Sequence, residues 1–100
     1  MKRLLNTTIA ILFLAPAVIA YQGPDLERGI DLYNAKKYTE AEQVLTQVIQ
    51  DNSENARAHE YLGLARLSLG KLDEAYAELS RAQDLAPTSD SVKVGLARVF

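Results

Sequence analysis

Identical residues recur in this chain at a fixed interval of 34 positions, without an insertion. The recurring pairs are Gly29 and Gly63, Lys37 and Lys71, Glu40 and Glu74, Ala41 and Ala75, and Leu45 and Leu79. A constant period of this length is typical of an array of helical repeats, in which each unit buries an apolar face against its neighbours. The period therefore predicts that the chain folds as stacked copies of one helical unit.

The unit from Ala56 to Ser89 has the clearest helical pattern. Its apolar residues are spaced three and four apart on both sides of a glycine turn: Leu62, Ala65, Leu69, Leu72, Ala75, Leu79, Ala82 and Leu85. This spacing predicts two amphipathic helices joined by one tight turn at Gly70. Pro87 ends the second helix, because it lacks a backbone N–H and restricts the residue before it. The small Gly63 predicts a close approach of a partner helix.

The earlier unit follows the same plan with less regular turn chemistry. Its first helix is expected to open at Pro24 and to run to about residue 35. A left-handed conformation at Lys36, where glycine is usual, would cost on the order of 1 kcal/mol. The next helix is expected to begin near Thr39, and the spacing of Thr39 and Glu42 predicts a capping box.

These features resemble the tetratricopeptide repeat (TPR) family. The residues that carry the resemblance are Gly29 and Gly63 within the first helices, the turn glycine Gly70, Tyr38 and Leu72 after the turns, the pairs Glu40-Ala41 and Glu74-Ala75, and then Ala82 and Pro87. The first unit departs from the family pattern, because Lys36 replaces a glycine and Ser53 replaces a proline. Asp25 and His59 occupy the place of the family's frequent tryptophan.

The resemblance implies an all-α fold, an α-α superhelix of antiparallel helix pairs. Together with the layout of the first 20 residues, it divides the chain into a signal peptide at residues 1–20, with its own signal helix, and a TPR domain at residues 21–100. Repeat one is expected at 22–55, repeat two at 56–89, and a partial third repeat or capping helix at 90–100.

The N-terminal 20 residues have the layout of a secretory signal. A basic start at Lys2-Arg3 precedes an apolar run from residue 9 to residue 20, and the sequence turns polar after Ala20. We expect cleavage after Ala20 and export, with the bacterial periplasm as the compartment. The alternative is an uncleaved inner-membrane anchor formed by residues 4–20, although the apolar run is shorter than the roughly 20 residues that span a bilayer.

Charge and cysteine content exclude several classes of partner. Removing Lys2 and Arg3 from the 11 basic residues leaves nine against 13 acidic residues, a net charge of −4. Such a chain lacks the basic stripe that nucleic-acid binding requires. It has no cysteine, so neither disulfides nor lipid attachment at a signal-peptide cysteine can stabilise or anchor it.

The titratable residues form no pattern of an enzyme or a metal site. His59 is the only histidine, which excludes a histidine cluster for a metal, and it is expected to pack between helices. Four acids at helical spacing, Glu27, Asp31, Glu74 and Glu78, are expected to lie on solvated helix faces. There is no paired nucleophile and base and no glycine-rich phosphate loop. We therefore predict no catalysis, no cofactor and no metal.

The last helix, expected from residue 90 after a cap at Thr88-Ser89-Asp90, presents an open edge. In repeat register Leu96, Ala97 and Phe100 are predicted to pack against the preceding helix pair. The remaining valines leave apolar surface uncovered. Self-association through Val92–Phe100, a loose cap, or a continuation of the array would each account for it.

The function predicted by the resemblance is binding by shape, because the first helix of each pair lines the concave side of such stacks. We call the corresponding eleven residues the predicted binding surface: Leu26, Ile30, Tyr33, Asn34, Arg57, Glu60, Leu64, Leu67, Ser68, Val94 and Arg98. Such a surface would suit a peptide or a segment of another protein, although Ile30, Leu64 and Leu67 would equally fit a helical core. TPR proteins that grip a C-terminal carboxylate use lysine and asparagine at places held here by Leu26, Ile30, Glu60 and Leu64, so that clamp is expected to be absent.

Two classes of function follow. The first is a non-enzymatic scaffold or adaptor in the cell envelope that binds a partner segment. The second is a structural or oligomerisation piece, or the N-terminal part of a longer TPR protein, anchored by residues 4–20 if they are not cleaved.

Overall fold

The computed structural model describes residues 25–100, and within this range the chain is helical and contains no strand. A first helix occupies residues 25–34. It is followed by α2 (Tyr38–Asp51), α3 (Ala56–Ser68), α4 (Leu72–Leu85) and α5 (Asp90–Val99). The predicted all-α class is confirmed for this range. The predicted signal peptide, its cleavage point and Pro24 lie outside the described residues.

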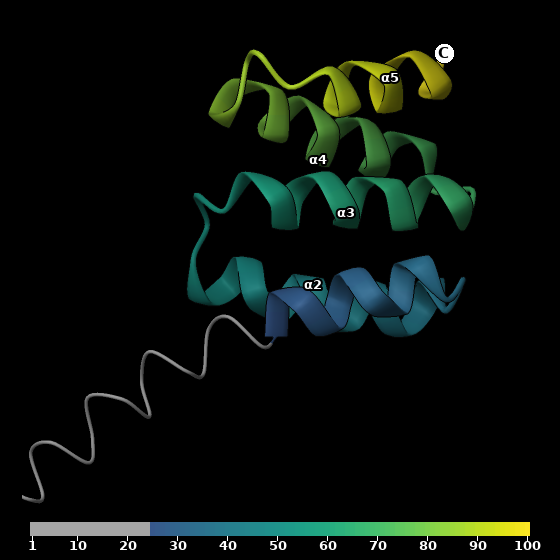
Figure 1. Ribbon diagram of the computed structural model, residues 1–100. Helices are drawn as coiled ribbons and strands as arrows, with labels where there is room; N and C mark the ends of the chain where they lie inside the picture. The colour runs from purple at the N-terminus through teal and green to yellow at the C-terminus, as the bar shows by residue number, and fades with distance from the viewer. Residues whose placement is uncertain (1–24) are drawn as a thin grey trace, which may run out of the picture.

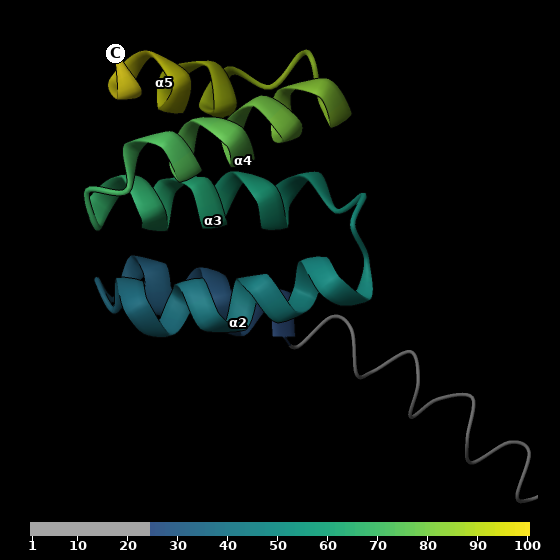
Figure 2. The same ribbon diagram turned by 180° about the vertical axis from the view of Figure 1, so that it is seen from behind.

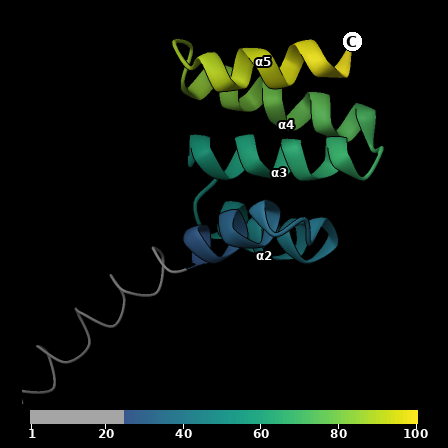
Figure 3. The ribbon, with the colours of Figure 1, turned by 45° about the vertical axis from the view of Figure 1, so that its right-hand side comes forward.

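The helices form a stack in which successive helices run in opposite directions (Figures 1 and 2). Helix 25–34, drawn in dark blue, lies beside α2, and α3, α4 and α5 follow in order (Figure 3). We call helix 25–34, α3 and α5 the A helices, and α2 and α4 the B helices. Each A helix therefore alternates with a B helix along the chain, as the 34-residue period predicts.

A glycine in each of the first two A helices allows the next B helix to approach closely. A Cβ built on Gly29 would lie 2.5 Å from Leu45 Cδ2, and one built on Gly63 would lie 2.6 Å from Leu79 Cγ. At such distances an added Cβ would force the facing leucine side chain to shift, so glycine permits the close contact seen here. The close approach predicted at Gly63 is confirmed and also occurs at Gly29, and the two leucines that fill the space are fully buried.

The core between the repeats is continuous. Ala41, Leu45, Leu62 and Ala65 form one buried cluster, and Leu26, Leu32, Tyr33, Ile49 and Tyr61 pack against it. Full burial of a leucine side chain stabilises a fold by about 1.5–3 kcal/mol. Because this cluster includes side chains from α2 and α3, it joins the two repeats rather than closing each one separately.

The two turns that link an A helix to the following B helix have the same hydrogen bonds. After helix 25–34, Lys36 N donates to Tyr33 O and Lys37 N donates to Leu32 O, both at 2.9 Å. This is a Schellman motif, which requires a left-handed residue at its centre. Lys36 has φ 63° there, as predicted, and Gly70 has φ 79° in the second copy of the turn.

The predicted capping box at Thr39 is wrong. Helix α2 begins at Tyr38, and its N-cap residue is Lys37, which makes no side-chain capping bond. Thr39 therefore lies inside the first turn rather than before it. Glu42, which a capping box would direct back to the helix start, instead accepts hydrogen bonds from Lys71 and Arg66.

Helix α5 has the predicted start but a different packing face. The Ser89 side chain accepts a hydrogen bond from Val92 N, which confirms the cap. Val92 and Gly95 are the residues that α5 buries, whereas Ala97 and Phe100 are exposed and Leu96 is half-buried. The prediction that these three pack backwards is therefore wrong for Ala97, whereas the Phe100 ring does contact α4, with its centroid 5.6 Å from that of Tyr76. The reason lies in the repeat itself, because Gly29 and Gly63 contact the B helix that follows them, and Ala97 holds the equivalent place.

Candidate functional site

The A helices contact one another along the predicted binding surface. The Tyr33 ring on helix 25–34 lies 5.5 Å from the Tyr61 ring on α3, at an interplanar angle of 78°. From α3 to α5, Leu64 Cδ2 lies 3.3 Å from the ideal Cβ position of Gly95. The Ser91 hydroxyl donates to Glu60 Oε2 across the same pair of helices. The eleven predicted residues therefore come from helices that lie side by side.

Burial divides the predicted residues into three groups. Ile30 and Glu60 are buried, with 6% and 8% of their surface exposed. Leu26, Tyr33, Leu64 and Leu67 are half-buried. Asn34, Arg57, Ser68, Val94 and Arg98 are exposed. Ile30 thus belongs to the core, while the four half-buried side chains keep part of their largely apolar surface accessible, and we call these four the apolar strip.

A row of aromatic rings, which the sequence reasoning missed in part, crosses this strip. Tyr38 lies 5.5 Å from Tyr33, and Tyr33 lies 5.5 Å from Tyr61, measured between ring centroids. The Arg57 guanidinium is 5.8 Å from the centroid of Tyr61, within the range of a cation–π interaction. Arg57 and Tyr61 are four residues apart, about one helical turn. This spacing could have predicted the contact between them from the sequence.

Glu60 is a buried acid with a neutral partner. The Ser91 hydroxyl is the group that donates to it, and Ser91 Oγ also lies 3.0 Å from Ser89 Oγ. The ion pairs of the described residues do not include Glu60. Position and chemistry therefore place a carboxylate that nothing within residues 25–100 balances in the middle of the predicted binding surface.

A separate group of charged residues joins α2, α3 and α4. Arg66 on α3 donates from Nε to Glu42 Oε2 at 3.0 Å and from Nη1 to Glu78 Oε1 at 3.2 Å. Lys71 Nζ lies 3.1 Å from Glu42 Oε1. The expectation that Glu78 lies on a solvated face is wrong, because 20% of its side chain is exposed and it is shared between two partners. Glu27, Asp31 and Glu74 are exposed, as expected.

The surroundings of Glu42 lower the pKa of its carboxyl group from 4.5. Burial alone would raise this pKa, but the hydrogen bonds from Lys71 and Arg66 and the charges of the same two residues outweigh it. The ionised form of Glu42 is thus stabilised by cations that come from α3 and from the turn after it. This group is structural, since it connects helices rather than facing the predicted binding surface.

His59 is packed between helices, as predicted. Its Nε2 donates to the Ser53 carbonyl oxygen at 2.8 Å, and its Nδ1 lies 2.6 Å from Glu78 Oε2. The carbonyl oxygen can only accept, so the proton on Nε2 is assigned by its partner. His59 therefore ties the turn before α3 to α4.

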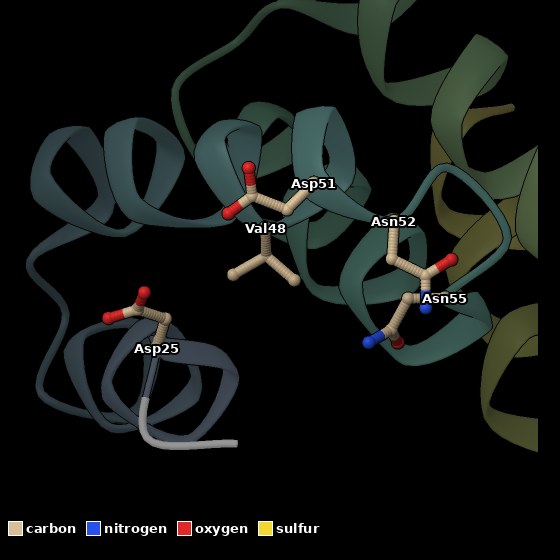
Figure 4. Close-up of a pocket in the computed structure, with 5 residues that line it drawn as sticks. All are labelled: Asp25, Val48, Asp51, Asn52 and Asn55. Carbon is tan, nitrogen blue, oxygen red and sulfur yellow. The ribbon is translucent and has the colours of Figure 1, made fainter. Parts of the chain in front are cut away.

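A small pocket of about 40 Å³ lies where α2 ends (Figure 4). Asp25 and Val48 line it from facing helices, and Asp51, Asn52 and Asn55 complete it. The side-chain oxygens of both asparagines accept hydrogen bonds from backbone N–H groups. Asn55 Oδ1 accepts from Ala58 N at 3.1 Å, and Asn52 Oδ1 accepts from Glu54 N at 3.1 Å. Within residues 25–100 the structure contains no group of three potential metal ligands. The pocket is therefore a capping arrangement at a helix junction.

None of the helices between residues 25 and 100 combines the length and the apolar character needed to cross a bilayer. Across this part of the chain, no arrangement of nucleophile, base and oxyanion donors points to catalysis.

The comparisons with known proteins agree on one family. A sequence model of the tetratricopeptide repeat family matches residues 17–90. A comparison with curated protein sequences found no match.

Solved TPR domains share the fold. The first TPR domain of Spaghetti (RPAP3), bound to the HSP90 peptide SRMEEVD, is 25% identical with a TM-score of 0.72, over 75% of this chain and 60% of that one. The Arabidopsis OM64 TPR domain is 28% identical with a TM-score of 0.72, over 75% and 62%. The second TPR domain of human RPAP3, in complex with the HSP70 peptide SGPTIEEVD, is 29% identical with a TM-score of 0.71, over 75% and 62%. The chain therefore spans less than two thirds of the length of these solved chains. Because the family model matches residues 17–90, the chain belongs to the tetratricopeptide repeat family.

Proposed function

We propose that this chain is a non-enzymatic protein–protein interaction module that holds a segment of another protein on the predicted binding surface. The observation that carries the proposal is the apolar strip of Leu26, Tyr33, Leu64 and Leu67, whose side chains are half-buried and keep part of their largely apolar surface accessible. Apolar and aromatic side chains form the centre of a typical protein interface. The peptides held by two of the similar TPR domains support a peptide segment as the ligand class.

The chemistry of the surface favours an apolar segment over an acidic C-terminus. The similar RPAP3 domain binds SRMEEVD, which ends in acidic residues. In this chain, Leu26, Ile30 and Leu64 stand where carboxylate-gripping TPR proteins place lysine and asparagine, and Glu60 adds a negative charge. We therefore expect SRMEEVD to bind this protein weakly.

The proposal can be tested with mixtures of amidated heptapeptides that are immobilised on a support. In each mixture one residue type is fixed and the other positions vary. Mixtures with a fixed leucine or phenylalanine are expected to retain the purified protein. Leu67→Glu should lower retention at least about tenfold, because a charge would be buried in an apolar contact. The matched control is Ala77→Glu, since Ala77 is an exposed apolar residue on α4, outside the surface. Circular dichroism of both variants confirms that the helices are intact. Equal retention of the wild type and of Leu67→Glu would refute the proposed surface.

A second function, self-association, is favoured by a separate observation. A shallow hollow of about 400 Å³ is lined by Leu72, Asp73, Tyr76, Val99 and Phe100. Three of these side chains are large, apolar and exposed, and clustered exposed apolar side chains are typical of association sites. We propose that a second copy of the chain covers this hollow and the adjoining face of α5, within Val92–Phe100.

We further propose that the protein acts in the bacterial cell envelope, exported by residues 1–20. The support is the basic, apolar and polar order of that segment. N-terminal sequencing of the protein recovered from a periplasmic extract checks this, with Tyr21 expected as the first residue. Recovery with Met1 in a membrane fraction would favour the anchor instead.

A further inference from the structure

We propose that Glu60 selects a basic residue in the bound segment, so that this protein prefers a cationic, apolar peptide. The inference rests on the proposed function and names the chemical class of its ligand. A receptor for an acidic peptide such as SRMEEVD has to favour negative charge in its ligand, whereas Glu60 would favour positive charge.

The burial of Glu60 is the first observation. Its exposed surface is 8%, and a buried carboxylate is normally balanced by a cation or by several donors, because removing it from water is costly. Here one hydroxyl donates to it, that of Ser91 on α5. A hydroxyl carries no charge, so nothing within residues 25–100 balances the negative charge of Glu60.

No basic group of the described residues supplies the missing charge. Arg57 lies one turn earlier on α3, but its guanidinium is placed over the Tyr61 ring, 5.8 Å from the ring centroid. None of the ion pairs within residues 25–100 involves Glu60. By contrast, the half-buried acids Glu42 and Glu78 each have a cationic partner at 3.2 Å or less. Glu60 is therefore the exception among the acids with low exposure.

The second carboxylate oxygen of Glu60 is the acceptor left for a ligand. Glu60 Oε2 accepts from the Ser91 hydroxyl, whereas no bond to Oε1 is found within residues 25–100. A lysine or arginine side chain of a bound segment would donate to Oε1.

The neighbours of Glu60 define the rest of the ligand. Leu64 follows one turn later on α3, and Val94 follows Ser91 by about one turn on α5. An approaching cation would thus be flanked by apolar contacts. A segment that alternates a basic residue with apolar residues fits both features.

Two arginines on the predicted binding surface carry the charge opposite to that of Glu60 and would attract an acidic segment. Arg57 and Arg98 are exposed, so water and salt screen their attraction for an acidic segment. The interaction with Glu60 is screened less, because its surroundings have a lower dielectric constant. The net charge of the chain, −2, also favours the encounter with a cationic partner.

The heptapeptide mixtures described above provide the test, with lysine, arginine, glutamate or aspartate as the fixed residue. The wild type is expected to be retained about tenfold more by the basic mixtures than by the acidic ones. Glu60→Gln, which keeps the shape and an acceptor for Ser91, should reduce this ratio to about one. Ser91→Ala keeps the charge and should keep the preference. Glu54→Gln is the matched control, because Glu54 is exposed in the turn before α3.

The outcomes separate this inference from the proposed function. In one outcome, the apolar mixtures retain the protein while the basic mixtures retain it no better than the acidic ones. In another, the basic preference persists in Glu60→Gln. Either result would refute the role of Glu60 without contradicting the proposed interaction module. Retention by none of the mixtures would refute both.

Discussion

Lys36 occupies a backbone conformation that is usually reserved for glycine. Its φ is 63°, against 79° at Gly70 in the equivalent turn. Both turns have the same pair of hydrogen bonds, so the conformation is imposed by the way in which an A helix joins a B helix. A left-handed residue with a side chain costs about 1–2 kcal/mol. The first repeat therefore contains a local strain that the second does not.

Replacing Lys36 with glycine should relieve this strain. We expect Lys36→Gly to raise the free energy of unfolding by about 1 kcal/mol. Gly70→Ala should lower it by about 1 kcal/mol, and through the backbone alone, since nothing lies within 4 Å of a Cβ at that position. Urea denaturation followed by circular dichroism measures both changes. Lys37→Gly is the control, because Lys37 has a negative φ. A Lys36→Gly variant that is less stable than the wild type would contradict the argument.

At this scale the sequence predicted backbone features better than side-chain partners. The glycine slot at Lys36 and the cap at Ser89 follow from short, local patterns, and both are confirmed. The capping box at Thr39 was also a local pattern, but it failed. Its acid, Glu42, pairs with Arg66 and Lys71. Those residues are far away in the sequence, and no local spacing could indicate that they compete for the same carboxylate.

At the scale of elements, Arg66 connects both B helices to α3. It lies between Glu42 on α2 and Glu78 on α4, at 3.0 and 3.2 Å. Hydrogen bonds to charged groups contribute about 1.5–3 kcal/mol each when they are well shielded. Because 19% of the Arg66 side chain is exposed, it should add substantially to the stability of the stack.

The lowered pKa of Glu42 predicts how this contribution depends on pH. A carboxyl whose folded-state pKa is depressed stabilises the fold above its unfolded pKa, and the stabilisation is lost as pH falls through the lower, folded value. We expect the free energy of unfolding to decline below about pH 4.5, the ordinary value for this group. Glu42→Gln should cost about 1–2 kcal/mol at pH 7 and should make the acid decline shallower.

Urea denaturation between pH 3 and pH 7 measures this effect. Glu40→Gln is the matched control, because Glu40 is exposed on the same helix. An acid decline that is equally steep in Glu42→Gln and in the wild type would show that other groups dominate.

Helix α5 shows where the period alone was insufficient. The register correctly placed Ala97 in the slot of Gly29 and Gly63, yet this slot faces the following B helix and not the preceding pair. The residues that α5 buries, Val92 and Gly95, lie on its other side. A repeat period defines which residues are equivalent, but the direction in which each of them points requires the geometry of a complete pair.

At the scale of the whole molecule, the two junctions between repeats use different chemistry at equivalent positions. In register, Tyr76 corresponds to Glu42 and Phe100 corresponds to Arg66. The ion pair of the first junction is thus replaced by two aromatic rings, whose centroids are 5.6 Å apart at 71°. Phe100 is 90% exposed and Tyr76 is 46% exposed. This exchange concentrates exposed apolar surface at one end of the described stack.

The proposed self-association should depend on these rings. We expect light scattering at on the order of 50 µM to show a dimer, and Tyr76→Glu should convert it to a monomer, since a charge would replace a buried ring. Ala77→Glu is the control, because Ala77 is exposed on the same helix as Tyr76 but does not line the hollow. A wild type that remains monomeric at this concentration and melts cooperatively would refute the dimer.

The overall fold could be predicted from the period, the turn residues and the helical spacing, because these are properties of the backbone and of hydrophobic burial. The candidate site was predicted only as a set of positions. Half-buried Leu64 and Leu67 could not be distinguished from core residues, and the burial of Glu60 could not be foreseen, because each depends on how closely α3 and α5 approach. The residues that join helices, such as Arg66, were missed for the same reason.

The replacement of one charged pair by two rings gives the two junctions of the stack opposite responses to ionic strength. Added salt weakens the attraction between Glu42 and Arg66 by screening, whereas a strongly hydrated salt such as sulfate strengthens the contact between the Tyr76 and Phe100 rings. Low salt therefore favours opening at the aromatic junction, and sulfate moves the weakest point towards the ionic junction. The medium around the protein, as well as its sequence, decides which junction opens first.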